Sequence, residues 1–249
     1  MLTKLLSDLH LHGNNPFYYE DHGEAVCILA GDISEGMFGV NWAVQFIPPH
    51  IQVLYIPGNH EYYGHDYTVL NARFSAHNLK ETHVRVMLND SKIINGVEFV
   101  CSTLWTDFDV YNNQPLHAIM WGGGLNDSRY IKVDARQLNH LDFIKWNSEA
   151  LSYIGDMAHQ TRPAEMVRVL VTHYCPEFSV AAHYRGNPLT PGFATKIPLH
   201  IHGAFDFHFH GHTHDCMDYK TPQGVKIKCN PRGYLFEKSG FNEALVLDL

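Results

Sequence analysis

Cysteine, long apolar runs and basic charge are all scarce in this sequence. The cysteines are odd in number and scattered, with no CxxC pair, so neither a disulfide framework nor a thiolate zinc site is expected. Charged and polar residues such as Lys4, Ser7 and Asp8 interrupt the first ten positions, and no run of 18 apolar residues follows. We therefore expect a cytoplasmic protein with neither a signal peptide nor a membrane partner. The five cysteines are Cys27, Cys101, Cys175, Cys216 and Cys229.

Basic residues are outnumbered: 18 Lys and Arg stand against 26 Asp and Glu, for a formal net charge of −8. No run rich in Lys or Arg appears. A surface of this sign repels a long phosphate backbone on average, which favours a small phosphorylated substrate as the partner. Nucleic acid is the alternative partner, and it would require a local basic groove.

Short apolar runs that end abruptly in polar residues are the main structural signal, and runs of this length are typical of buried strands. Helical patterns lie between several of them, and the alternation predicts an α/β fold. Residues 35–46 form one helical pattern, with Phe38, Trp42 and Phe46 four apart on one face, and residues 66–78 form another. The apolar runs are 2–6, 25–30, 51–56, 166–172 and 205–209.

Two further patterns complete the prediction. Asn95-Gly96 separates two apolar stretches and predicts a hairpin with a type I′ turn. Residues 106–137 are irregular and precede an amphipathic pattern over 138–159. We interpret 106–160 as a cap or insertion beside the site, with a tolerated surface insertion as the alternative, inside a single domain covering residues 1–249.

The polar residues at the strand ends include carboxylates, imidazoles and a carboxamide. Each has an ordinary explanation by itself, such as a helix cap, a turn or a structural histidine. Five separate strand ends carry such groups, and open α/β sheets bind ligands beyond the carboxyl ends of their strands. Oxygen and imidazole donors without thiolates suit divalent Mn, Fe, Zn, Co or Ni, so we predict a metal site. The residues are Asp8, His10, Asp32, Asn59, His60, His173, His212 and His214.

The order of these residues resembles the signature of the calcineurin-like metallophosphoesterases, which is DxH, GD, GNH[DE], H and GHxH. Here the five blocks are Asp8-Leu9-His10, Gly31-Asp32, Gly58-Asn59-His60-Glu61, His173 and Gly211-His212-Thr213-His214. They span residues 8–214, and no block lacks a ligand. The segments 184–188 and 229–234 resemble a prokaryotic or phage-type branch of predicted phosphoesterases.

The resemblance implies a two-sheet αββα sandwich of mixed sheets flanked by helices, and a centre with two divalent or mixed-valence metal ions. By motif position, one ion is held by Asp8, His10, Asp32 and His214. The other is held by Asp32, Asn59, His173 and His212, so that Asp32 bridges the pair. A hydroxide between the ions would attack phosphorus, and two ions stabilise the attacking and leaving oxygens together.

The resemblance also gives His60 a role in assisting the leaving group, with Asp32 and His60 as the catalytic pair. In the protein phosphatase branch an aspartate three residues after the bridging carboxylate orients this histidine, and an arginine follows it. Glu35 and Gly36 occupy these positions here, which argues against a protein phosphatase. Glu35 either orients His60 or only begins a helix.

Two arginines, Arg185 and Arg232, are candidate substrate contacts because guanidinium groups suit phosphate oxygens, with structural salt bridges as the alternative. The predicted function is hydrolysis of a phosphodiester, by resemblance a small nucleotide-like one. The alternatives are a phosphomonoesterase, a nuclease, and a non-catalytic scaffold of the same fold that binds a protein partner.

Overall fold

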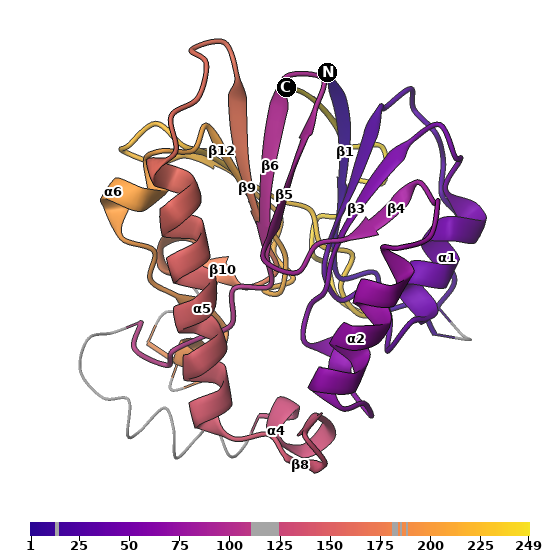
Figure 1. The fold of residues 1–249 in the computed structure, drawn as a ribbon, viewed down its shortest axis with the longest axis vertical. Helices are drawn as coiled ribbons and strands as arrows, with labels where there is room; N and C mark the ends of the chain where they lie inside the picture. The colour runs from indigo at the N-terminus through magenta and orange to yellow at the C-terminus, as the bar shows by residue number, and fades with distance from the viewer. Residues whose placement is uncertain (13–14, 111–124, 181–183, 185, 188) are drawn as a thin grey trace.

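The computed structural model describes residues 1–12, 15–110, 125–180, 184, 186–187 and 189–249. Two large mixed β-sheets face one another, and helices cover the outer face of each (Figure 1). This arrangement confirms the predicted αββα sandwich of the α/β class.

The first sheet has five strands, and only its edge strand β15 runs antiparallel to its neighbour. Its central strands are buried over nearly their whole length because helices cover one face and the second sheet covers the other. In spatial order the strands are β15 (Val246–Asp248), β1 (Leu2–Leu6), β2 (Val26–Ala30), β3 (Gln52–Ile56) and β4 (Val84–Val86).

The second sheet has six strands with a parallel centre and an antiparallel strand at each edge. Asn95 and Gly96 join β5 to β6 with φ values of 49° and 82°, which confirms the predicted type I′ hairpin. In spatial order the strands are β13 (Met217–Lys220), β14 (Lys226–Cys229), β12 (Phe207–His210), β9 (Val167–Thr172), β6 (Val97–Ser102) and β5 (Asp90–Ile94).

Apolar side chains from both sheets fill the space between them. Leu5, Ile28 and Leu54 of the first sheet pack in one cluster with Phe99 and Phe209 of the second, and all five are fully buried. Removal of this much apolar surface from water is the main force that holds the sheets together.

The outer layers are helical (Figure 1). Helices α1 (Phe38–Phe46) and α2 (Tyr67–His77) cover the first sheet, and α5 (His140–His159) with α6 (Leu199–His202) covers the second. Helix α5 begins at a capping box in which Asn139 and Asp142 each accept the other's backbone N–H. Five short elements lie within the loops: η1 (His60–Tyr62), η2 (Glu177–Ser179), η3 (Thr190–Gly192), β10 (Cys175–Pro176) and β11 (Ala194–Thr195).

Helix α1 differs from its predicted pattern. It begins three residues later than predicted, and Phe38 and Phe46 are 59 % and 53 % exposed whereas Trp42 is buried. The face turned to the sheet carries Val40 and Ala43 with Trp42 instead. The four-residue spacing correctly predicted a helix. It did not predict which face packs against the sheet, because the segment has two apolar faces.

Part of the segment 106–160 belongs to the main layers. Its residues 111–124 lie outside the described residues; the rest forms α4 (Asp127–Tyr130), β7 (Lys132–Val133), β8 (Arg136–Gln137) and α5. Because α5 covers the second sheet, it is one of the sandwich layers. The cap, the single domain and the cytoplasmic location stay predictions. In the part of the chain that the structure describes, no helix has the length and apolarity to cross a membrane.

The two chain ends lie side by side at one end of the sandwich (Figure 1), where the amino group of Met1 is 2.7 Å from Asp248 Oδ1. The carboxyl ends of the central strands meet at the other end. There the N–H of His10 donates to the carbonyl of Asp32 at 3.0 Å, and the N–H of His212 donates to the carboxylate of Asp8 at 3.0 Å. These bonds bring the loops of both sheets together.

Candidate metal centre

The predicted ligands all lie in loops that follow β1, β2, β3, β9 and β12. Five of them are non-glycine residues with positive φ, a conformation that costs free energy and is concentrated at functional sites. The surrounding hydrogen bonds hold these loops in strained shapes that turn the side chains inward. The five residues and their φ values are Asp8 (52°), His10 (45°), Asp32 (56°), His212 (73°) and His214 (51°).

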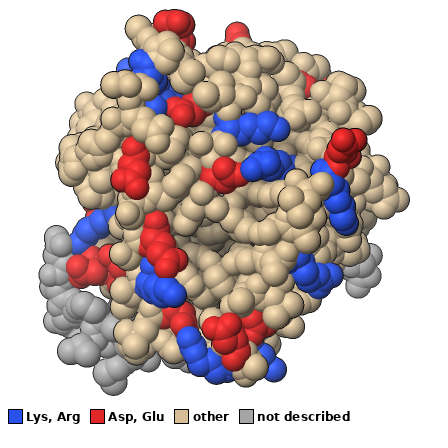
Figure 2. All heavy atoms as spheres, viewed as in Figure 1, with Lys and Arg blue, Asp and Glu red and all other residues tan. Residues whose placement is uncertain are grey.

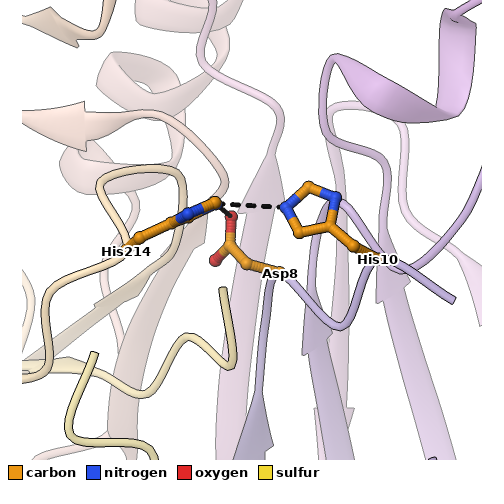
Figure 3. A group of neighbouring side chains, drawn as sticks. All are labelled: Asp8, His10 and His214. Carbon is orange, nitrogen blue, oxygen red and sulfur yellow. Dashed lines mark hydrogen bonds and ion pairs between the residues drawn. The ribbon is translucent and has the colours of Figure 1, made fainter. Parts of the chain in front are cut away.

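Asp8, His10 and His214 form one compact group (Figure 3). His10 Nε2 lies 3.1 Å from His214 Nε2, and His214 Nε2 lies 3.4 Å from Asp8 Oδ1. The two imidazoles approach from opposite sides with the Asp8 carboxylate beside them (Figure 3). One ligand atom of each residue lies within 4.8 Å of those of the others.

Asp32, His173 and His212 form a second group, which Asn59 joins. His173 Nε2 is 3.3 Å from Asp32 Oδ1, 3.0 Å from His212 Nδ1 and 3.1 Å from Asn59 Oδ1. The other ring nitrogen of His173 is 2.9 Å from the carbonyl of Ala30, which fixes the ring. Four donors from four different loops therefore converge on one point.

Asp32 belongs to both sides of the site. It also forms a third group with His10 and His60. Nε2 of His60 lies 3.9 Å from Asp32 Oδ2. Oδ1 thus faces the second group while Oδ2 faces His60. Because His10 is also a member of the first group, Asp32 lies within reach of both groups, as expected of a carboxylate shared by two cations.

The donor set fits divalent metal ions. Two imidazole nitrogens bound to one ion at about 2.1 Å, with ligand angles of about 90–109°, lie roughly 3.0–3.4 Å apart. The observed N···N distances of 3.1 Å for His10 and His214, and 3.0 Å for His173 and His212, match that expectation. Buried carboxylates surrounded by imidazoles, with no thiolate, suit Mn, Fe, Zn, Co or Ni.

Burial and charge shift the ligands' pKa values in opposite directions. Burial opposes ionisation of Asp8, but the hydrogen bond and charge of His214 lower its pKa to about 2. Burial likewise lowers the pKa of His10 to about 4 and of His212 to about 3. Burial works against protonation of His173 as well, yet the charge of Asp32 raises its pKa to about 9. The hydrogen bond and charge of Asp8 likewise raise the pKa of His214 to about 9 against the effect of burial. At neutral pH the site without metal therefore holds ionised Asp8, neutral His10 and His212, and protonated His173 and His214, and metal binding would release the protons of the last two.

Two glycines of the motif, Gly31 and Gly58, lie so close to candidate ligands that a side chain would not fit. A Cβ on Gly58 would lie 2.1 Å from Asp32 Oδ1 and 2.7 Å from His173 Nε2. A Cβ on Gly31, which has φ +87°, would lie 2.2 Å from His173 Nδ1. Any larger residue at either position would displace the candidate ligands.

His60 lies at the edge of the centre and lines the pocket above it. Its ring stacks on Tyr63 with centroids 4.2 Å apart, and its Nε2 is 3.3 Å from the hydroxyl of Tyr234. Glu35 is exposed and makes neither a hydrogen bond nor an ion pair with His60 among the described contacts. Glu35 does not begin the helix either, because α1 starts at Phe38 with Met37 as its N-cap and has no acidic residue in its first turn. Neither predicted explanation for Glu35 therefore matches the described contacts.

The two candidate arginines have different outcomes. Arg185 lies outside the described residues. Arg232 does not line the pocket: its guanidinium donates to the carbonyls of Leu9, Asn15 and Pro16 and lies over the ring of Phe17. These contacts give Arg232 a structural role in place of the predicted substrate contact, because its donors are directed to backbone oxygens.

Four residues without a predicted role also contact the centre. Glu61 accepts backbone N–H groups of the loops after β2 and β3, and Glu237 Oε2 is 2.5 Å from His214 Nδ1. Asp127 binds the amide of Asn59, and Tyr234 stacks on His10 at 4.4 Å. Glu61 is the last residue of the motif Gly58-Asn59-His60-Glu61, but nothing in the sequence indicates these contacts.

A cavity of about 350 Å³ opens above the centre. Its lining residues come from three further parts of the chain beside the ligand loops: Tyr63 with residues 125–127, five residues between Val180 and Phe193, and Tyr234 with Glu237 near the C-terminus. Beside the candidate ligands and His60, its walls are largely aromatic and apolar. These wall residues are Tyr63, Leu125, Val180, Tyr184, Leu189, Phe193 and Tyr234.

Comparison with known proteins identifies related sequences and folds. The sequence model of the family described as "calcineurin-like phosphoesterase" matches residues 2–216. The uncharacterized protein L509 of Acanthamoeba polyphaga mimivirus is 24 % identical over 220 residues, which cover 81 % of this chain and 75 % of the viral protein.

Two solved structures show the same fold at low sequence identity. The phosphopantetheinyl hydrolase PptH of Mycobacterium tuberculosis aligns with a TM-score of 0.70 at 17 % identity, covering 93 % of this chain and 89 % of that one. A putative 5'-nucleotidase of Staphylococcus aureus aligns with a TM-score of 0.51 at 14 % identity, covering 93 % and 49 %.

Proposed function

Because this chain belongs to the calcineurin-like phosphoesterase family and is a metal-dependent phosphoesterase, we propose that it is a dinuclear enzyme that hydrolyses a small phosphodiester of nucleotide-like size. The observation that carries the proposal is the place of Asp32 between two groups of ligands. Asp32 is grouped on one side with His173 and His212 and on the other with His10, a candidate ligand of the first ion.

The chain's own residues account for binding and proton transfer. When bound, two cations would supply Lewis acidity and an ionised water near neutral pH. Asp32 is fixed for its bridging position because its Oδ1 accepts the backbone N–H of His60 at 2.9 Å. That bond also places the His60 side chain above the centre. His60 lines the cavity with its Nε2 3.3 Å from the hydroxyl of Tyr234, and from this position it can donate a proton to the leaving oxygen.

The shape of the cavity supports a diester with at least one planar organic group. A diester carries two organic groups, and the cavity offers apolar and aromatic surface for them beside the candidate ligands, from Tyr63, Leu125, Tyr184 and Phe193. Aromatic rings bind planar groups such as nucleobases by stacking. A volume of about 350 Å³ suits a small molecule and is too small for a long polymer.

The charge distribution supports a small substrate over nucleic acid. On the face shown in Figure 2, Lys and Arg are interspersed with Asp and Glu, and neither sign gathers into a continuous stripe. A nuclease needs a basic track along which a phosphate backbone can lie.

The test compares bis-(p-nitrophenyl) phosphate with p-nitrophenyl phosphate in metal-stripped protein re-supplied with Mn, Fe, Zn, Co or Ni. We expect metal-dependent turnover with the diester preferred, and loss of activity in Asp32→Asn and His212→Ala without unfolding. His50→Ala is the matched control, because His50 is exposed and pairs with Asp21, away from the candidate ligands. Preference for the monoester would overturn the diester assignment. A folded protein that binds no metal and cleaves neither ester would overturn the whole proposal in favour of a scaffold.

A further inference from the structure

A buried carboxyl group from the 106–160 segment lies directly against a candidate metal ligand. Oδ1 of Asp127 accepts the amide N–H of Asn59 at 2.7 Å. Asp127 is 5 % exposed and Asn59 is 3 % exposed, so water cannot replace either partner. The residues are 68 positions apart in the chain, and the contact therefore depends on the fold.

This contact decides which end of the Asn59 carboxamide faces the centre. A carboxylate only accepts hydrogen bonds, so the NH₂ end must turn towards Asp127. The amide nitrogen also donates to the hydroxyl of Tyr63 at 3.4 Å, so both of its hydrogens have partners. The carbonyl oxygen is left on the opposite side, 3.1 Å from His173 Nε2. Only that oxygen can bind a cation.

Backbone hydrogen bonds hold Asp127 in place. The N–H of Gly64 donates to the carbonyl of Tyr130 at 2.9 Å, and the N–H of Lys132 donates to the carbonyl of His65 at 3.0 Å. A third bond joins the N–H of Ala135 to the carboxylate of Asp66 at 2.8 Å. The segment 127–135 is thus attached to the loop that follows Asn59, and α4 presents Asp127 to the carboxamide.

We propose that Asp127 is a positioning residue for the second cation: it fixes the Asn59 carboxamide with its oxygen turned towards Asp32, His173 and His212. The inference rests on the proposed dinuclear function. It also makes the 106–160 segment necessary for one of the two ions, although none of the candidate ligands comes from the part of that segment that the structure describes. Partners of this kind are typically worth about 10–100-fold in metal affinity.

Titration calorimetry with Mn²⁺ on metal-stripped protein separates this role from simple packing. In Asp127→Ala we expect the Asp8–His10–His214 site to bind as in the wild type, whereas affinity for the second ion falls about 10–100-fold. Asp127→Asn keeps the side-chain volume but no longer dictates the amide direction, so we expect an intermediate loss. Asp134→Asn, an exposed carboxyl of the same segment, is the matched control and should bind both ions normally.

A reciprocal exchange keeps the test decisive if Asp127→Ala folds poorly. In Asn59→Asp combined with Asp127→Asn, the NH₂ group at position 127 donates to one oxygen at position 59 and the other oxygen faces the cation. Both ends of the side chain at position 59 are then oxygens, so its direction no longer has to be fixed. We expect this pair to recover most of the affinity lost in Asp127→Asn. Normal binding of both ions by Asp127→Asn and Asp127→Ala, or no recovery in the exchanged pair, would overturn the inference. Fewer than two ions in the wild type would instead refute the proposed function.

Discussion

The carboxylate of Glu61 accepts the backbone N–H of Asp32 at 3.0 Å, and so holds the proposed bridging residue through its main chain. The same carboxylate accepts the N–H of Ile33 at 2.8 Å and of Gly58 at 2.7 Å, and the hydroxyl of Tyr55 at 2.7 Å. Glu61 is fully buried. It therefore ties the loop after β2 to the loop after β3, and these loops carry Asp32 and Asn59.

Replacement of Glu61 by glutamine should loosen both loops. Glu61→Gln keeps the shape but turns an NH₂ group towards donors, leaving buried N–H groups without an acceptor. We expect the free energy of unfolding in urea to fall by about 2–4 kcal/mol for the metal-free protein, and the affinity for both ions to fall. Glu35→Gln, at an exposed position near the same loop, is the control. Unfolding curves that coincide for wild type and Glu61→Gln would contradict this account.

The motif Gly58-Asn59-His60-Glu61 shows what the sequence could and could not predict. The ends of the strands and the order of the candidate ligands can be predicted because both depend on local sequence: an apolar run followed by polar residues. For example, β1 ends at the predicted residue, Leu6. The role of Glu61 depends on backbone N–H groups of a different loop, whose positions exist only after folding. Asp127 and Glu237 were not predicted as site residues for the same reason.

The buried face of helix α1 also could not be predicted from the local sequence pattern. Phe38 and Phe46 made an apolar stripe that the structure leaves exposed, because the sheet contacts the neighbouring stripe of Val40 and Ala43. Arg232 was a reasonable phosphate contact by chemistry alone. Its partners are backbone carbonyls, which the sequence does not place.

Glu237 should strengthen binding of the ion held by Asp8, His10 and His214. Its Oε2 is 2.5 Å from His214 Nδ1, and a carboxylate on the outer nitrogen of a ligand histidine fixes the ring and its tautomer. In Glu237→Gln we expect affinity for the Asp8–His10–His214 ion to fall by about tenfold with the second ion unchanged, the opposite of Asp127→Ala. Calorimetry with Mn²⁺ measures both, and Glu243→Gln on the same exposed tail is the control. Equal weakening of both sites would show that Glu237 does not act through His214.

His60 should show its role through the leaving group. His60→Ala should retain both ions, because His60 is not needed in either ligand group. We expect loss of up to about 10²–10⁴-fold in kcat for substrates with poor, alkoxide-like leaving groups and little loss for p-nitrophenol. Tyr234→Phe, which removes the hydroxyl 3.3 Å from Nε2, should cause a smaller loss in the same direction. An equal loss for good and poor leaving groups would remove the proton-donor role.

A chain of hydrogen bonds outside the centre should make stability depend on pH. The hydroxyl of Thr172 donates to the carbonyl of Tyr174, so it accepts from His208 Nε2 at 2.9 Å. His208 Nδ1 then accepts from His202 Nε2 at 3.1 Å, and both rings are neutral in this arrangement. Burial lowers the pKa of His202 to about 4 and the pKa of His208 well below its ordinary value.

The sign of the effect follows from proton binding. Between pH 6.5 and 4 the unfolded chain binds protons at these histidines and the folded protein does not, so stability falls as the pH falls through this window. For His202 alone the loss amounts to about 3 kcal/mol by pH 4. His202→Gln keeps a donor for His208 but cannot titrate, so its urea-unfolding free energy should fall less steeply than that of wild type, both measured without metal. His50→Gln, at an exposed position, should follow the wild-type curve. Removing a group that titrates must change the slope of unfolding free energy against pH. If wild type and His202→Gln lose stability with the same slope, the buried histidines do not cause the pH dependence.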